Sequence, residues 1–73
     1  MQNTYWDKPV RAGGCLILGP LEAHRFLMHE WPSRKNQDWC EAESSMLAAL
    51  DGRTTTDEAR ERFEAALKSA QLS

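Results

Sequence analysis

Residues 46–67 constrain the fold more than any other stretch of the chain, because every local signal in them predicts a hairpin of two helices. The first helix ends near Leu50, and Gly52 supplies the left-handed residue at which helices commonly stop. Thr55, followed three residues later by Glu58, forms a capping box that starts the second helix. No catalytic or ligand-binding motif interrupts the segment, so the sequence is more informative about fold than about function.

The length of the chain, 73 residues, predicts one small domain over 1–73, with residues 1–5 frayed. Its composition, 41% hydrophobic and 27% charged, is typical of a soluble globular protein. A domain of this size buries only about 60–65% of the surface that its unfolded chain exposes. Its stability is therefore marginal unless a disulfide, a metal ion or an oligomer adds to the core.

The charge balance argues against nucleic-acid binding. Nine lysines and arginines face eleven aspartates and glutamates, and no basic stripe is visible, whereas nucleic-acid-binding proteins carry a positive field that displaces counterions. The longest apolar run, 15–18, has the length of a strand and not of a membrane span. The N-terminal residues lack the charged start and apolar core of a signal peptide, so we expect a cytoplasmic protein.

The pattern over residues 6–18 predicts a β-hairpin. Gly13 and Gly14 separate two strand-like runs, and the favoured two-residue turns require positive φ at such positions. Pro9 cannot donate a hydrogen bond to a neighbouring strand, so the first strand should begin late or lie at an edge. The second run, 15–18, is apolar on both faces, and we expect something to cover its far side.

The next segment reads as a helix that begins at Gly19-Pro20 and ends at Trp31-Pro32. Phe26 falls outside the apolar arc of this helix. The arc gathers Leu21, Ala23, His24, Leu27, Met28 and Trp31.

Two further helices follow the polar loop after Pro32. Asp38 with Glu41 resembles a capping box at the start of the first of them, and the second runs to about Ser69. The expected buried arc of the first is Trp39, Ala42, Met46, Ala49 and Leu50, with Cys40 and Leu47 at its margin. The expected arc of the second is Ala59, Phe63, Ala66, Leu67 and Ala70. The predicted fold is α+β, an N-terminal β-hairpin followed by three α-helices packed in one small domain.

The chain resembles the Domain of Unknown Function 982 family of short bacterial proteins. The resemblance covers nearly the whole chain and rests mainly on Trp31-Pro32, Ala42, residues 46–53 and residues 57–66. These motifs are structural, so the resemblance implies a family but no activity. Met46 stands where we expect a cysteine in many members, which argues against a shared catalytic thiol at that position.

His24 and Glu43 are the strongest candidates for chemistry. Both fall within apolar arcs, and a buried pair of this kind could act as an acid/base couple. The alternative is a half-buried His24 with satisfied hydrogen bonds and a Glu43 whose carboxylate lies in solvent. We expect no catalytic residues and no cofactor.

A metal site is the second possibility, because Cys15, His24, His29 and Cys40 are all ligand types for zinc. Their spacings match no known zinc motif, and five residues of helix turn His29 about 500° from His24, to another side. We therefore expect no metal site, and we expect both cysteines to behave as small buried hydrophobes.

The interface candidates are side chains that the core pattern does not explain. Trp6 and Phe26 lie outside the expected arcs, while Cys15 and Ile17 belong to the strand that is apolar on both faces. An uncovered apolar strand is usually paired or covered, and a two-fold contact is the commonest way to do so. The sequence therefore predicts a homodimer that uses these four residues.

The last two helices also have the outline of a helix-turn-helix. The second of them is too acidic for phosphate contacts, and its charges are expected to pair as Glu58–Arg62 and Glu64–Lys68. We therefore expect a non-enzymatic protein–protein interaction or regulatory module. The alternatives are a small metal-binding or enzymatic domain that uses His24 and Glu43, and a nucleic-acid-binding regulator.

Overall fold

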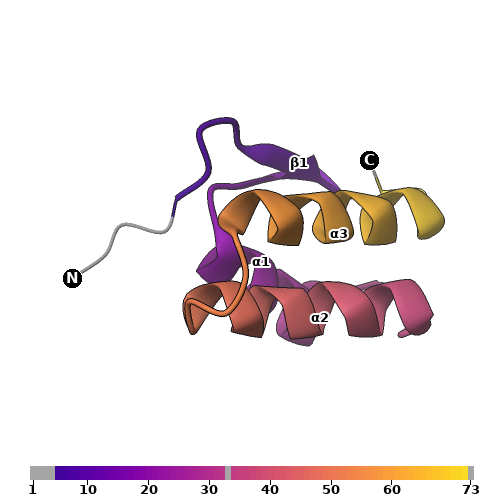
Figure 1. Ribbon diagram of the computed structural model, residues 1–73. Coiled ribbons are helices and arrows are strands. Elements are labelled where there is room, and N and C mark those ends of the chain that lie inside the picture. Colours follow the sequence, from indigo (N-terminus) through magenta and orange to yellow (C-terminus); the bar gives the residue numbers. More distant parts are fainter. Residues whose placement is uncertain (1–4, 33, 73) are drawn as a thin grey trace.

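The computed structural model describes residues 5–32 and 34–72. A two-stranded hairpin leads into a helical part, which confirms the predicted α+β fold (Figure 1). In chain order the elements are β1 (Val10–Ala12), β2 (Cys15–Ile17), α1 (Pro20–Arg25), the π-helical turn η1 (Phe26–Glu30), α2 (Gln37–Leu50) and α3 (Thr56–Ser69).

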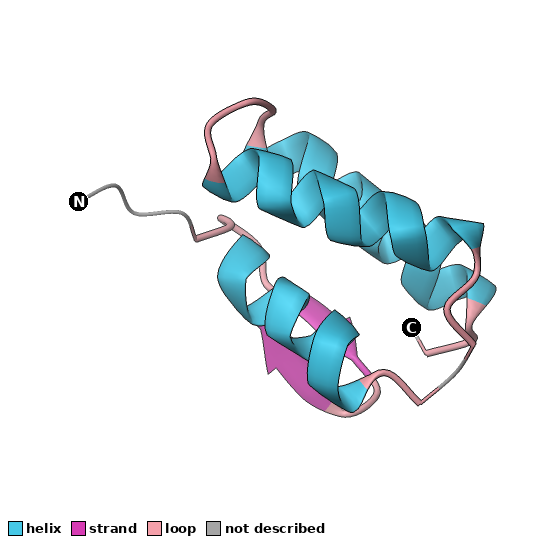
Figure 2. Cartoon of the chain, turned by 90° about the horizontal axis from the view of Figure 1, so that it is seen from below, coloured by secondary structure: helices cyan, strands magenta, loops and turns pink. Residues whose placement is uncertain are grey.

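The elements form two layers. The hairpin and α3 make one layer, and α1 with η1 lies beside α2 in the other (Figures 1 and 2). Figure 2 views the molecule from the side of α1 and α2, with the strands behind α1. Among residues 5–32 and 34–72, none of the helices is long and apolar enough to cross a membrane.

The hairpin follows the prediction closely. β1 and β2 pair antiparallel, and the turn residues Gly13 and Gly14 have φ of +53° and +90°, as a two-residue hairpin turn requires. β1 begins only after Pro9, because proline has no backbone N–H to donate to the neighbouring strand. Ile17 packs into the core, whereas Leu16 stays 58% exposed on the outer face. The cover that we expected over this outer face is not provided by the described residues.

The first helix is rotated relative to the prediction. Its start is as expected, because Gly19 is the N-cap and Pro20 the first helical residue. The arc is wrong, because Phe26 is buried while Leu21 and Met28 are 51% and 44% exposed. The ring of Phe26 packs edge-on against Phe63, at 6.2 Å between ring centroids, and an aromatic ring buries more area than a leucine. The π-helical turn also departs from the 100° per residue that a helical wheel assumes.

The start of α2 also differs from the prediction. Asn36, and not Asp38, is the N-cap, and its side-chain oxygen accepts a hydrogen bond from the Trp39 backbone N–H at 3.0 Å. The buried face matches the prediction at Trp39, Ala42, Met46 and Ala49. Leu50 departs from it and is 37% exposed.

The turn between α2 and α3 confirms the prediction from residues 46–67. Gly52 has φ of +81°, and the Thr55 hydroxyl caps α3 by accepting from the Glu58 backbone N–H at 3.1 Å. The Glu58 carboxylate accepts a hydrogen bond from the Thr54 hydroxyl. The buried face of α3 consists of Ala59, Phe63, Ala66 and Leu67, as predicted, whereas Ala70, which was also expected there, is the half-buried C-cap residue.

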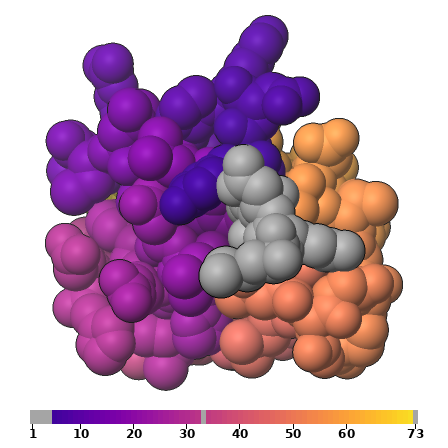
Figure 3. Space-filling model, turned by 90° about the vertical axis from the view of Figure 1, so that its left-hand side faces the viewer, coloured from indigo at the N-terminus to yellow at the C-terminus, as the bar shows by residue number. Residues whose placement is uncertain are grey.

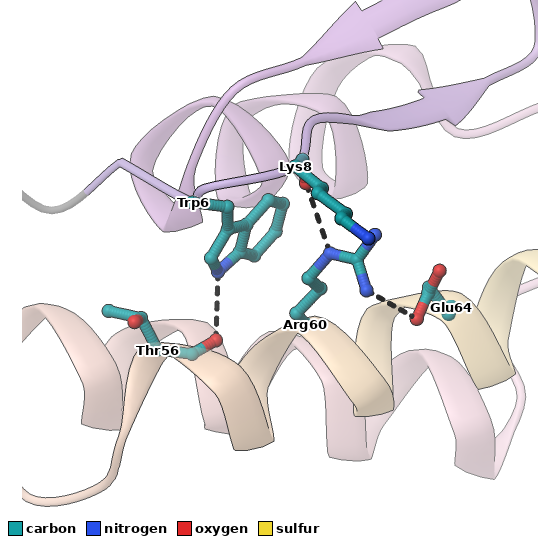
Figure 4. Close-up of polar contacts among 5 residues, drawn as sticks. All are labelled: Trp6, Lys8, Thr56, Arg60 and Glu64. Atoms are coloured by element: carbon teal, nitrogen blue, oxygen red, sulfur yellow. Dashed lines mark hydrogen bonds and ion pairs between the residues drawn. The ribbon is translucent and has the colours of Figure 1, made fainter.

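The segment before β1 is fastened along α3 (Figure 4). The Trp6 indole N–H donates to the Thr56 carbonyl at 2.8 Å, and the Trp6 ring stacks on Phe63 at 6.0 Å between centroids. The Arg60 guanidinium donates to the Lys8 carbonyl at 3.1 Å through Nε. These two hydrogen bonds join residues that are 50 and 52 positions apart in the chain.

Candidate interaction surface

Three of the four predicted interface residues lie inside the domain. Trp6, Ile17 and Phe26 are only 6%, 5% and 5% exposed, and all three belong to the hydrophobic core. Trp6 and Phe26 were predicted as interface residues because the expected core pattern did not include them. That premise is wrong, because both rings pack against Phe63. Among the four candidates only Cys15 is exposed.

Four of the seven exposed large apolar side chains of the described residues lie on the first two helices, and the other three, Tyr5, Leu16 and Leu18, lie before β1 and in or just after β2. Leu21 and Met28 belong to α1 and η1, and Leu47 and Leu50 belong to α2, with exposed fractions of 51%, 44%, 43% and 37%. Within the described residues α3 contributes no exposed large hydrophobic side chain. The apolar surface of the helical part is therefore on one layer.

A contact between His24 and Glu43 joins these two helices. His24 Nε2 lies 3.3 Å from Glu43 Oε2, and the two side chains are 24% and 23% exposed. The candidate pair is thus brought together by the fold, at the seam between α1 and α2.

The direction of the helices follows from a second contact. The Trp39 indole N–H donates to the Leu27 carbonyl at 3.0 Å. Residue numbers rise along the first helix and fall along the second, because 24 meets 43 and 27 meets 39, so the two helices run antiparallel.

The exposed apolar residues consequently flank the His24–Glu43 contact. Leu21 lies one turn before His24, and Leu47 and Leu50 lie one and two turns after Glu43, so the three leucines share one end of the seam. Met28 and the exposed Cys40 lie at the other end. We call this surface the α1–α2 face; it comprises Leu21, His24, Met28, Cys40, Glu43, Leu47 and Leu50. In Figure 3 the purple surface of α1 adjoins the pink surface of α2 at the lower left.

Four hollows lie on the described surface, and two of them border this face, because Cys40 and Leu47 each line one. Two, of about 350 and 450 Å³, are on the seam of α2 and α3 and include Ser44, Ser45 and Arg62. Two others, of about 410 and 240 Å³, lie where the hairpin meets α3 and α1. Neither His24 nor Glu43 lines any of these four hollows, so none of them presents the acid/base pair to a substrate.

The charges of α3 are arranged differently from the prediction. Arg60 pairs with Glu64 at 3.2 Å, and Arg62 reaches across to Glu41 of α2 at 3.4 Å. The predicted Glu58–Arg62 pair does not form, because Arg62 contacts Glu41 and the Glu58 carboxylate accepts from the Thr54 hydroxyl. Glu64, expected to pair with Lys68, contacts Arg60. Both arginines thus lie beside carboxylates.

The possible metal ligands are not brought together. Cys15 lies on β2 and Cys40 on α2, and among residues 5–32 and 34–72 no group of three or more His, Cys, Asp or Glu side chains could hold a metal ion. Both cysteines are exposed, which corrects the expectation that they are buried. Cys15 follows the hairpin turn directly, and Cys40 points away from the buried Trp39–Ala42 face of its helix.

Comparison with known proteins bears on the family and not on the site. A family model described as "Protein of unknown function (DUF982)" matches residues 10–73, from the first residue of β1 onward. No curated protein and no solved structure gives a significant match. The match covers nearly the whole chain, and the chain therefore belongs to the DUF982 family.

Proposed function

We propose that this chain is a non-enzymatic protein–protein interaction module that binds its partner through the α1–α2 face. The observation that carries the proposal is the set of four half-exposed apolar side chains around the half-buried His24–Glu43 contact. The set consists of Leu21, Met28, Leu47 and Leu50. Exposed apolar residues that gather on one surface, rimmed by polar groups, mark interaction sites.

The free energy gained by covering these apolar side chains is of the size expected for a recognition surface. Full burial of a leucine or methionine side chain is worth about 1.5–3 kcal/mol, so covering side chains that are roughly half exposed is worth about 1 kcal/mol each. The four side chains together supply on the order of 4 kcal/mol, which is the apolar centre of a moderate contact. Polar contacts around the rim would have to supply the rest.

The cellular setting is part of the same proposal. Cys15 and Cys40 are both free and exposed, as is usual in a reducing compartment. This supports action in the cytoplasm, where thiols stay reduced.

A small acid/base domain that uses His24 and Glu43 is the second candidate. The 3.3 Å contact between these side chains supports it. None of the four hollows described above includes either side chain, which favours the interaction module over a substrate site at this pair. The interaction module is therefore preferred.

Affinity capture with matched variants tests the proposal. The tagged chain is compared with a Leu21→Arg/Leu47→Arg variant and with Ala65→Arg, a control on an exposed position of α3. We expect the parent and the control to capture the same defined protein, whether another copy or a different chain, and the double variant to lose it. Equal capture by all three proteins, with circular dichroism showing that each is folded, would contradict the proposal.

A further inference from the structure

We propose that the outer edge of β2 and the adjoining flank of α1 and η1 bind an extended segment of another protein, which adds a third strand to the hairpin. The hollow of about 240 Å³ between these elements marks the place, and its lining includes Cys15, Leu16, Glu22, Arg25 and Glu30. None of these five residues belongs to the α1–α2 face, so the inference goes beyond the proposed function.

The backbone of β2 has an unpaired edge at Leu16. In a hairpin with a two-residue turn, the residues that flank the turn, Ala12 and Cys15, exchange both of their hydrogen bonds, and the next pair exchanges none. The N–H and C=O of Leu16 therefore point away from β1. Within the part of the chain that the structure describes, they make no backbone hydrogen bond with another element. Such an edge is a template for a further strand.

This edge runs beside the first helix, which lies in front of the strands in Figure 2. Two residues beyond Leu16, the Leu18 N–H donates to Glu22 Oε1 at 2.8 Å, so the helix closes that end of the edge. At the other end, the hollow extends from Cys15 to Glu30. Residue numbers thus fall along β2 while they rise along the helix, and the two segments run antiparallel.

The register between strand and helix follows from their dimensions. A strand residue spans about 3.3 Å and a helical residue about 1.5 Å, so one step back along β2 corresponds to about two steps forward along the helix. Counted from the hydrogen bond between positions 18 and 22, Ile17 is about level with Arg25. By the same count, Cys15 is about level with Glu30.

Two charges on this flank are available to a partner. Arg25 and Glu30 are both exposed, and among the ion pairs of the described residues neither takes part in one. The Glu22 carboxylate, in contrast, already accepts the hydrogen bond from the Leu18 N–H. The partner therefore meets a positive charge first and a negative charge second, in the direction from Ile17 to Cys15.

These positions specify the chemistry of the occupant. An added strand antiparallel to β2 places three consecutive residues opposite Ile17, Leu16 and Cys15. The first and third face the helix, as the buried Ile17 does, so an acidic first residue meets Arg25 and a basic third residue meets Glu30. The second faces outward beside Leu16, which is 58% exposed, and an apolar residue there covers it.

The occupant is thus an extended segment that reads acidic, apolar, basic. A second copy of this chain does not supply that pattern through its own β2, because Cys15, Leu16 and Ile17 include no charged residue to meet Arg25 or Glu30. Opposite charges across an interface fix its register and discriminate between partners. The charges therefore favour a different chain over the predicted second copy at this strand.

Selection from a library of random seven-residue peptides displayed on phage tests the proposal. With the parent chain we expect enrichment of peptides that carry an acidic, an apolar and a basic residue in this order. The double variant Arg25→Glu/Glu30→Arg keeps the net charge and changes only exposed side chains, and it should enrich the opposite order, basic before acidic. No enrichment by the parent, or the same order from both proteins, would overturn the proposal.

A matched pair of proline variants tests whether the peptide binds at the edge of β2. Leu16→Pro removes the outward N–H of β2, and Arg11→Pro removes the equivalent N–H of its pairing partner, on the outer edge of β1. Fluorescence anisotropy of the selected peptide, labelled with fluorescein, measures its Kd. We expect Leu16→Pro to raise the Kd at least about tenfold and Arg11→Pro to change it less than about twofold. Equal effects of the two variants, with circular dichroism showing that both are folded, would refute binding at this edge.

This inference and the proposed function can fail separately. The Leu21→Arg/Leu47→Arg variant changes the α1–α2 face and should bind the selected peptide as tightly as the parent does. Loss of peptide binding in this variant, with its fold intact, would place the peptide on the α1–α2 face and overturn the inference. Loss of the captured protein with unchanged peptide binding would support two separate binding surfaces.

Discussion

Replacing Trp6 tests whether this residue is part of the core or part of an interface. Trp6 is 6% exposed, its ring stacks on the fully buried Phe63 at 6.0 Å, and its indole N–H donates to the Thr56 carbonyl at 2.8 Å. If these contacts hold the N-terminal segment on α3, their loss destabilises the isolated domain. If Trp6 mainly served an interface, its loss would leave the stability of the monomer almost unchanged.

The expected magnitude of the Trp6→Ala change is large. Truncation of a buried aromatic residue to alanine costs about 3–5 kcal/mol. A domain of 73 residues has a total stability of about 4–11 kcal/mol at 0.05–0.15 kcal/mol per residue. Trp6→Ala should therefore remove about a quarter of the total or more. Trp6→Phe keeps most of the ring contact with Phe63 but loses the hydrogen bond, and should cost about 1–2 kcal/mol.

Urea denaturation followed by far-ultraviolet circular dichroism measures both values, because tryptophan fluorescence would itself change with the substitution. All proteins are compared at one concentration, and the comparison is repeated at a tenfold higher concentration to separate unfolding from dissociation. A Trp6→Ala cost below about 1 kcal/mol, the size of an ordinary surface change, would refute the core assignment.

Three further substitutions test the helix ends and the helix packing by the same denaturation assay. Gly52→Val should cost more than about 1 kcal/mol, because φ of +81° strains a β-branched residue, and a cost near zero would show that the helix stop is misplaced. Asn36→Ala should cost about 0.5–2 kcal/mol of stability through loss of the N-cap hydrogen bond, whereas Asp38→Ala should cost less. A larger cost for Asp38→Ala would show that Asp38 is the N-cap. Ala66→Leu should cost about 1–3 kcal/mol because Ala66 is 1% exposed, while the exposed Ala65→Leu should be nearly neutral, and equal effects would contradict the close packing of α3.

The parts of the fold that could be predicted are those with local causes. The Gly13-Gly14 turn, the start at Pro20, the stop at Gly52 and the Thr55 cap each depend on the backbone preferences of one or two residues. Such preferences follow from the residue types alone and do not depend on contacts with the rest of the structure. The family resemblance rested on the same local features and is confirmed by the match over residues 10–73.

The parts that could not be predicted depend on contacts between distant residues. Trp6 and Phe26 become core residues only because both reach Phe63. One signal of the α1–α2 face was nevertheless present in the sequence. The predicted arc of the first helix, together with Phe26, held more apolar residues than one buried flank of a short helix can cover, so some of them had to remain exposed.

Which of them remain exposed was decided by packing. The rotation that buries Phe26 leaves Leu21 and Met28 on the surface, beside the His24–Glu43 contact. A helical wheel alone could not predict that Phe26 is buried in place of Leu21 and Met28. The burial of Phe26 is favoured by its contact with Phe63, which is 37 positions further along the chain.

The most direct measurement of the central claim is photo-cross-linking from the α1–α2 face in the cells that produce the protein. A photoreactive amino acid is placed at Met28, which is 44% exposed, and in a separate chain at the exposed Ala65 of α3 as the control. The account predicts a discrete cross-linked protein from position 28, either a second copy or another chain, and none from position 65. No adduct at position 28, or the same adducts from both positions, would contradict the claim that this face binds a protein.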